Sequence, residues 1–261
     1  PGGAADRVGL YCLPVMQRLY INPDYASLLN GAGLDNYEEL YASDLAGDIV
    51  SSCTNRTTRR VEIAGRGFYL KRVYKPRPRK ALEALLKFNP PHHYCWREMQ
   101  QVQALGNAGF AVMDVAAAGE TTQLGVPVHS FILAPEVSGE PLDKAFSRSD
   151  RERRCALVSQ LGAYTARLHD AGFFTPVRLK DVICSDSGAM VLIDRETRHP
   201  GRHRFTTQRA SDALFRTFHR ERRDGTRWSA DEQSAYCEAY RDTIRGKWQA
   251  DAEELRRICQ L

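Results

Sequence analysis

No stretch of this chain holds the roughly 18 consecutive apolar residues that a membrane-spanning helix needs. The segment from Pro1 to Tyr20 also lacks the charged region followed by an apolar region that marks a secretory signal peptide. The sequence therefore predicts neither a transmembrane helix nor a signal peptide.

Cysteine is present, but in a pattern that argues against its two common structural uses. The seven cysteines are odd in number and never spaced as Cys-x-x-Cys, which disfavours both a disulfide framework and a zinc site. The adjacent His92 and His93 have no third partner at the spacing of metal ligands. We expect reduced thiols, packed as small apolar side chains, in a cytosol-like compartment.

Positive charge is the main compositional feature. The net charge of +5 comes largely from three basic clusters, at residues 71–80, 198–209 and 219–227. Such clusters can bind phosphate groups, anionic lipid head groups or nucleic acid, although a charged run is more often a solvated face. They hold few aromatic residues for base stacking and no recognition motif. A nucleic-acid-binding protein is thus the weakest hypothesis, and we expect no nucleic-acid partner.

The first half of the chain reads as strands around two helices. Alternating apolar residues on either side of the Gly-containing turn at 64–67 predict a hairpin. Further strands are predicted at 48–52, 111–120 and 128–137. A short helix is predicted at 81–88, and a longer one at 94–110 has apolar residues spaced by three.

The second half is mainly helical. Helices are predicted at 151–172, 211–222 and 229–259, with a hairpin of short strands at 182–184 and 190–194 between the first two. Residues 138–147, punctuated by Gly139 and Pro141, read as a linker. The expected fold is α+β in two lobes, hinged near 134–141. It comprises an N-terminal extension (1–40), a strand-rich N-lobe (41–137) and a mainly helical C-lobe (138–261).

Three charged residues stand out by position. Lys71 lies within an apolar strand, where it either reaches out of the sheet edge or points into a cleft. Glu98 lies on the next long helix and could pair with it. Asp194 ends the last short strand, where a carboxylate facing a cleft is well placed to hold a metal ion, and a strand-end cap is the alternative interpretation.

With these pieces in order, the chain resembles the protein-kinase-like fold and, within it, the bacterial lipopolysaccharide core (heptose or Kdo) kinases. The matching stretches are "RRVEIAGRGFYLKRVY", "WREMQQVQALGNAGF", "LHDAGF" and "SDSGAMVLIDRE", within a span from about residue 48 to about residue 240. The resemblance implies ATP and Mg²⁺ as cofactors. It also implies lipopolysaccharide core or a protein of the cell envelope as partner, and a cytoplasmic location, with peripheral contact to the anionic inner membrane left open.

Residue by residue, the resemblance implies a nucleotide site. Lys71 matches the lysine that grips the nucleotide phosphates, and Glu98 the glutamate that holds it. Asp194 matches the aspartate that binds magnesium. Ala134 and Glu136 lie in "FILAPEV", the stretch whose main chain would hydrogen-bond adenine. A cation and a metal holder suit phosphoryl transfer, which depends on positioning and charge neutralisation.

The catalytic loop departs from the family pattern, in which "LHxAGxxH" leads to an aspartate two residues after the second His. Here Thr175 stands at the His position, Val177 at the Asp position and Val182 at a metal position. Sliding the register by one residue gives Pro176 and Asp181. Neither register leaves a carboxylate to accept a proton from a substrate hydroxyl.

Asp181 and His169 each have two interpretations. Asp181 is a candidate second metal ligand or displaced base, against the simpler interpretation as a solvated turn residue. His169 is expected to pack as a structural, hydrogen-bonding residue under the loop.

The sequence leads to a preferred function and two alternatives. The phosphate-covering stretch 51–60 lacks glycine, which makes close backbone approach to phosphates harder. Together with the missing base, this predicts a pseudokinase with a binding or regulatory role in cell-envelope biogenesis. The first alternative is an active ATP-dependent heptose or Kdo kinase that uses Asp194 and Asp181. The second is the nucleic-acid-binding protein.

Overall fold

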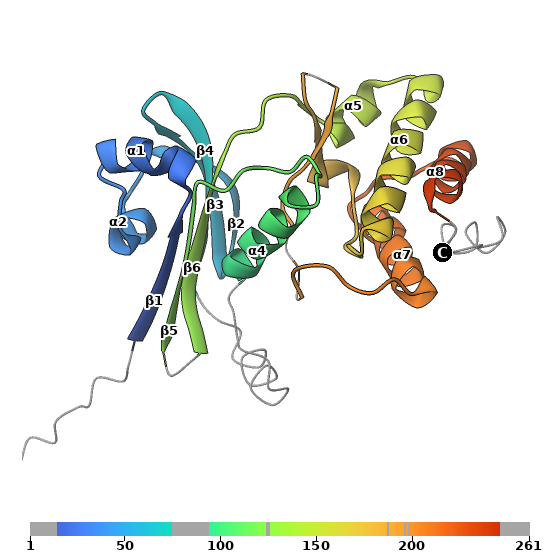
Figure 1. Ribbon diagram of the computed structural model, residues 1–261. Helices are drawn as coiled ribbons and strands as arrows, with labels where there is room; N and C mark the ends of the chain where they lie inside the picture. Colours follow the sequence, from blue (N-terminus) through green and yellow to red (C-terminus); the bar gives the residue numbers. More distant parts are fainter. Residues whose placement is uncertain are drawn as a thin grey trace, which may run out of the picture. The chain divides into compact units, whose positions relative to one another are not determined.

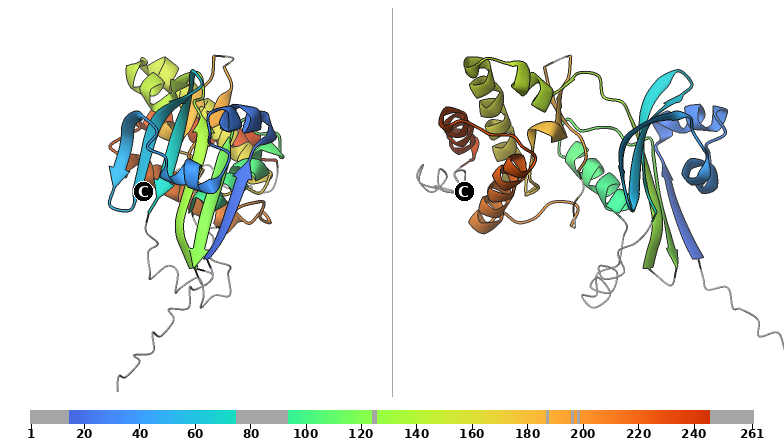
Figure 2. Two further views of the ribbon diagram at one scale, coloured as in Figure 1. Left: turned by 90° about the vertical axis from the view of Figure 1, so that its left-hand side faces the viewer. Right: turned by 180° about the vertical axis from the view of Figure 1, so that it is seen from behind.

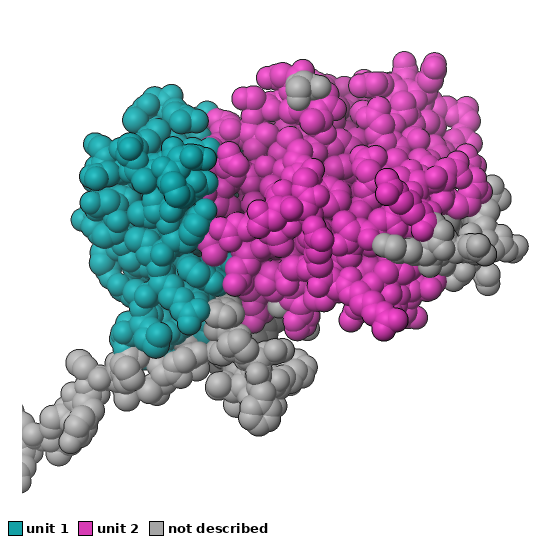
Figure 3. All heavy atoms as spheres, viewed as in Figure 1, with its two compact units in different colours: residues 1–96, 116–133 teal, residues 97–115, 134–261 magenta. Residues whose placement is uncertain are grey.

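The computed structural model describes residues 15–74, 94–123, 126–186, 188–195, 197 and 199–245. The chain divides into two compact units, shown in different colours in Figure 3. Unit 1 combines residues 1–96 with 116–133, and unit 2 combines 97–115 with 134–261. Each unit has its own hydrophobic core, and the lobe boundaries expected from the sequence stay a prediction.

A six-stranded sheet is the framework of unit 1 (Figures 1 and 2). Its strands lie in the order β1 (Val15–Ile21), β5 (Ala117–Gln123), β6 (Val126–Pro135), β4 (Arg66–Val73), β3 (Arg56–Ile63) and β2 (Gly47–Cys53). β1 runs antiparallel to β5, so residues 15–21 belong to the sheet. This strand has no counterpart among the sequence predictions.

The predicted hairpin is confirmed as β3–β4, in which Val61 pairs with Phe68. Its turn is formed by Ala64 and Gly65, with φ of 48° and 76°. Two consecutive residues with positive φ are what a two-residue type I′ hairpin turn requires, and the twist of this turn matches that of the strands. The turn sets the register of β4, the strand that carries Lys71.

Two helices complete the core of unit 1. α1 (Pro23–Gly31) begins at Asn22, whose side chain caps it, and α2 (Tyr37–Ala42) begins at Asn36 in the same way. Leu29 of α1 and Leu40 of α2 are fully buried, in one cluster with Phe68 and Phe131 of the sheet. Residues 15–40 therefore contribute a strand, a helix and the start of a second helix to this unit.

Unit 2 is built on helices. They are α4 (Tyr94–Gly106, whose first residues belong to unit 1), α5 (Leu142–Arg148), α6 (Arg151–Asp170), α7 (Thr207–Arg223) and α8 (Ala230–Thr243). α6 and α8 pack closely at Gly162, where a Cβ would overlap the carbonyl oxygen of Tyr236. The predicted helices at 94–110, 151–172 and 211–222 correspond to α4, α6 and α7. The one at 229–259 corresponds in part to α8, since residues 246–261, like the predicted helix at 81–88, lie outside the described residues.

The expected linker at 138–147 is wrong. The short strand β7 (Glu140–Pro141) pairs with Cys184, and α5 follows it directly. Leu142 and Phe146, four residues apart, are both buried in the core of unit 2. This apolar pair at helical spacing outweighs the Gly and Pro that precede it. None of the described helices is long and apolar enough to cross a membrane.

Candidate functional site

The second predicted hairpin is confirmed and carries Asp194. β8 (Val182–Cys184) runs antiparallel to β9 (Met190–Leu192), and Asp194 follows β9 with an exposed side chain. Its φ of 51° lies in the left-handed region. Among the described residues other than glycine, only Asp194 and Ala64 have a positive φ, and Ala64 sits in a tight turn. A positive φ is uncommon for residues other than glycine, although Asp adopts it more readily than most, and such residues cluster at functional sites.

α6 ends so that the chain turns into the candidate catalytic loop. Gly172 has a φ of 90°, the backbone N–H of Phe173 donates to the carbonyl of Leu168, and that of Gly172 donates to the carbonyl of His169. These two bonds form a Schellman motif, which stops a helix and satisfies its last carbonyl groups. The "LHDAG" stretch therefore directs residues 173–181 away from the helix axis.

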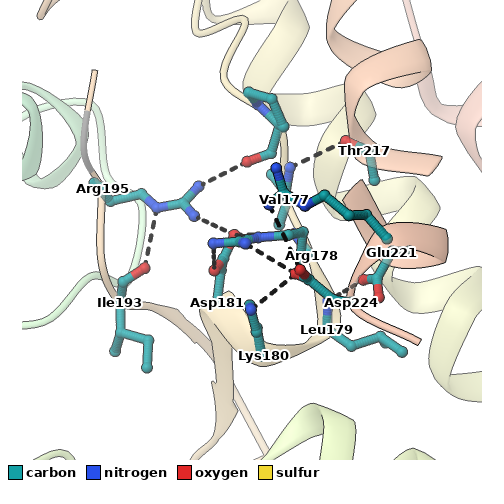
Figure 4. A network of polar contacts seen from close by, with 12 residues as sticks. Val177, Arg178, Leu179, Lys180, Asp181, Ile193, Arg195, Thr217, Glu221 and Asp224 are labelled. Atoms are coloured by element: carbon teal, nitrogen blue, oxygen red, sulfur yellow. Dashed lines mark hydrogen bonds and ion pairs between the residues drawn. The ribbon is translucent and has the colours of Figure 1, made fainter. Parts of the chain in front are cut away.

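The loop is fixed to α7 at Val177, one of the two positions at which the sequence resemblance would place the catalytic base. Val177 is fully buried, and its backbone N–H donates to the hydroxyl of Thr217 at 3.1 Å (Figure 4). The N–H of Leu179 donates to the carboxylate of Glu221 at 2.6 Å. Burial raises the pKa of Glu221, against the opposing effect of its hydrogen bonds with the backbone of Leu179 and with Thr226. Position 177 is thus occupied by a buried apolar side chain, and its backbone N–H is already hydrogen-bonded.

Asp181 is the centre of a buried ion-pair network (Figure 4). It is 3% exposed, and its carboxylate accepts from Arg178 at 2.7 and 2.9 Å and from Arg195 at 3.1 Å. Arg195 is itself buried and also donates to the carbonyls of Ile193 and Pro176. The interpretation of Asp181 as a solvated turn residue is wrong. Its role as a metal ligand or base stays a prediction that requires an ion pair to open.

A more exposed layer of charge surrounds this centre. Arg178 donates to Asp224 at 3.0 Å, and the ammonium group of Lys180 lies 2.8 Å from the same carboxylate. Burial acts to raise the pKa of Asp224, but the hydrogen bonds and charges of Lys180 and Arg178 outweigh it and lower the pKa. Arg178 therefore links the loop both to Asp181 and to the end of α7.

His169 is confirmed as a structural residue. It is fully buried, and its Nδ1 shares a hydrogen bond of 2.7 Å with the hydroxyl of Tyr240. The ring also lies against Phe174. Burial, and next the positive charge of Arg216, lower the pKa of His169 to about 3, so the imidazole is neutral at physiological pH.

This burial predicts an acid-sensitive stability. Between the ordinary pKa of 6.5 and about 3, the unfolded chain binds a proton at His169 that the folded chain does not. The contribution of neutral His169 to the free energy of unfolding is therefore fully present above pH 6.5. It falls as the pH drops, by up to about 1.4 kcal/mol per pH unit. Urea unfolding of wild type and His169→Phe from pH 7 to pH 4 measures this slope. The slope should be shallower in the variant and unchanged in His219→Gln, which alters an exposed histidine. Equal slopes of the free energy of unfolding against pH in all three proteins would show that His169 is not the source of the acid sensitivity.

The predicted nucleotide residues lie in both units. Lys71 is in β4 of unit 1, opposite Thr58 of β3. Glu98 is in α4 of unit 2 and is 1% exposed. Ala134, at the end of β6, is buried, and Glu136 directly after it is exposed. The ion pair between Lys71 and Glu98 and the adenine contacts stay predictions.

The site also contains residues that were not singled out from the sequence. Thr217 and Glu221 are buried polar residues four apart on α7, on the same face as Leu214 and Phe218. A polar pair interrupting an apolar helical face is the signal that could have identified them. Arg195 gave no such signal, since its partners Asp181 and Pro176 lie 14 and 19 residues earlier in the chain.

A magnesium ion would rely on Asp194 here. Within the described ranges, no three His, Cys, Asp or Glu side chains gather in a way that could hold a metal. Mg²⁺ is commonly held by one or two carboxylates together with phosphate oxygens, so a single exposed carboxylate suits an ion that arrives with a nucleotide. Asp181, engaged by two arginines, is not poised to be the second ligand.

Comparison with known proteins identifies the family of this chain. Residues 42–240 match the lipopolysaccharide kinase (Kdo/WaaP) family. The lipopolysaccharide core heptose(I) kinase WaaP of Pseudomonas aeruginosa is 29% identical over 161 residues, which are 59% of this chain and 59% of that protein. The match thus spans less than two thirds of the relative's length.

Solved structures show the fold. A structure described as WaaP in complex with acyl carrier protein gives a TM-score of 0.59 at 21% identity and covers 92% of both chains. A MAP kinase from Leishmania major gives a TM-score of 0.41 at 13% identity, over 88% of this chain and 82% of that one. The expected α+β, protein-kinase-like fold is confirmed. Because the family match extends over most of its length, this chain belongs to the lipopolysaccharide kinase (Kdo/WaaP) family.

Proposed function

We propose that this protein is a pseudokinase of the family, which binds nucleotide but transfers phosphate to a hydroxyl poorly. The observation that carries the proposal is Val177, the base position in the register without gaps, which is fully buried and whose N–H donates to Thr217. The register shifted by one residue places Pro176 there, which is no base either. A hydrocarbon side chain can neither accept a proton nor orient a hydroxyl. The nearest acidic residue along the loop, Asp181, is held by Arg178 and Arg195.

The nucleotide half of the site is proposed to remain. Lys71 would hold the nucleotide phosphates and Glu98 would orient Lys71, while the backbone at Ala134 and Glu136 would hydrogen-bond adenine. Asp194 would hold Mg²⁺, which neutralises phosphate charge when bound. The left-handed backbone of Asp194 supports this role, since such a conformation is rarely kept without a reason.

An active sugar kinase is the second candidate, and the conformation of Asp194 favours it too. Much of the catalysis of phosphoryl transfer is electrostatic, so an unusual site can retain part of its rate. In this case the γ-phosphoryl group of ATP would pass to a heptose or Kdo hydroxyl. Asp181 would accept the proton after leaving Arg195.

Partners and location are proposed on the same basis. The structure of WaaP with acyl carrier protein supports a protein partner for this chain as well. Lipopolysaccharide core and the anionic surface of the inner membrane suit the basic clusters, for which a cytoplasmic location is proposed. The role would then be binding or regulatory, in cell-envelope biogenesis.

Thermal unfolding with ATP, with and without Mg²⁺, tests the nucleotide site. Millimolar ATP with Mg²⁺ is expected to raise the Tm of wild type by several degrees, since a ligand at 100 times its Kd adds about 2.7 kcal/mol. Asp194→Ala should lose the part that depends on Mg²⁺, whereas Asp186→Ala, an exposed aspartate in the turn after β8, should keep it. An unchanged Tm of wild type with ATP and Mg²⁺ would contradict the proposed nucleotide site.

A further inference from the structure

One face of α7 carries a row of arginines beside the candidate catalytic loop. Arg216, Arg220 and Arg223 follow one another at spacings of four and three, which places them along one side of the helix. The helix is bonded to the loop through Thr217 and Glu221 (Figure 4), and Arg216 donates to the carbonyl of Phe174 at 3.4 Å. The row therefore lies next to residues 174–181, where an acceptor substrate of a kinase would be expected.

Arg220, in the middle of the row, is half-buried, and none of the described residues supplies an acceptor for its side chain. No carboxylate or carbonyl oxygen of the described residues forms an ion pair or hydrogen bond with its guanidinium group. By contrast, Arg178 and Arg195 are both paired with Asp181. Because the side chain is partly exposed, a ligand can reach N–H donors of this guanidinium group that no acceptor of the described residues occupies.

The surroundings of Arg220 are positively charged. Burial, followed by the charges of Arg178 and Arg216, lowers the pKa of Arg220, and Arg223 adds to this effect. Only Asp181 acts in the opposite direction, and its carboxylate is already shared by two other arginines. Asp181 and Asp224 pair with Arg178, and Asp224 also lies 3.5 Å from Arg223. Among the described residues, no carboxylate pairs with Arg216 or Arg220.

We propose that Arg216, Arg220 and Arg223 form a binding site for the phosphate group of an anionic ligand beside the loop at 174–181. A phosphate monoester carries nearly two negative charges and three acceptor oxygens, which several guanidinium groups can share. Arginine recognises phosphate with paired N–H bonds that are shorter and stronger than neutral ones. The ligand is a phosphorylated sugar or a phospholipid head group, which offer the same chemistry.

The site stands apart from the proposed nucleotide function. It uses none of the residues assigned to ATP or magnesium. Phosphate binding at the three arginines can therefore be measured even if the protein fails to bind ATP. Its removal should not harm the fold either. Arg220→Gln takes away no ion pair and relieves repulsion, so the Tm of this variant should equal or exceed that of wild type.

Calorimetric titration of the full chain with pyrophosphate and with glucose 6-phosphate, at low salt, measures the affinity. Arg220→Gln should weaken binding by about tenfold or more, as expected for the loss of a charge-assisted bond, and Arg220→Lys by less. Arg209→Gln is the matched control, since it removes the same charge from an exposed position on the same helix. It should change the affinity by no more than about twofold, because long-range charge effects are screened.

Vesicle flotation separates the two sources of phosphate. Binding of glucose 6-phosphate identifies a soluble phosphorylated ligand. Binding only to phosphatidylcholine vesicles that also contain phosphatidylglycerol, lost in Arg220→Gln and kept in Arg209→Gln, identifies a head group. The proposal is overturned if wild type binds none of these probes, or if the two glutamine variants weaken binding equally.

Discussion

Replacing Asp181 by alanine is expected to lower the free energy of unfolding by about 3–5 kcal/mol, the cost of breaking a buried ion pair from one side. The side chains of Asp181 and Arg195 are 4% and 2% exposed, so the variant leaves the charge of Arg195 buried without its carboxylate. Arg178 loses three hydrogen bonds at the same time, two from its side chain and one from its backbone N–H. Urea unfolding at neutral pH, followed by circular dichroism, measures the change.

Two further variants separate this effect from a general sensitivity of the loop. Asp186→Ala removes an exposed aspartate in the nearby hairpin turn and should change stability by no more than about 0.5 kcal/mol. The double variant Asp181→Leu with Arg195→Met removes both charges and should recover much of the loss, because apolar replacements of a buried pair are often tolerated. A loss below about 1 kcal/mol in Asp181→Ala would show that water reaches the pair.

The sequence predicted the elements whose evidence is local. The hairpins β3–β4 and β8–β9 follow from alternating apolar residues around turn residues, and α4 follows from apolar residues spaced by three. β1 carries no such pattern: it is an edge strand whose Val15 and Met16 are largely exposed. Its conformation is set by pairing with β5, about 100 residues away, which no local pattern reveals.

In the candidate site too, the features predicted from the sequence are local, and those that depend on distant contacts were not predicted. Asp194 was identified because it ends a short strand, a local feature, whereas its left-handed backbone was not foreseen. The sequence around Asp181 is that of an ordinary turn. It gives no sign of the ion pair with Arg195, which follows the next hairpin in the chain. Buried ion pairs join segments that are distant in sequence. Such pairs depend on tertiary packing. Here the ion pair with Arg195 shows that Asp181 is a buried residue and not a solvated turn residue.

Phosphate transfer to purified lipopolysaccharide core is expected to be about 10²–10⁴-fold slower with this protein than with its Pseudomonas aeruginosa relative assayed beside it, the usual contribution of a general base. Val177 offers no proton acceptor, and Asp181 is occupied by two guanidinium groups. Any residual transfer would come from positioning and charge, so Lys71→Ala should abolish it. Asp181→Asn should leave it unchanged, provided the variant is folded under the assay conditions.

An active kinase would give the opposite pattern. The wild-type rate would approach that of the relative, and both Asp194→Ala and Asp181→Asn would abolish it, since one residue holds the metal and the other accepts the proton. Asp186→Ala should retain full activity in that case, which excludes a loss caused by removing any acidic group near the hairpin. Asp181 can serve as a base only after it leaves Arg195. Arg195→Met should then raise the rate if the ion pair restrains the base, and should leave it unchanged in a pseudokinase.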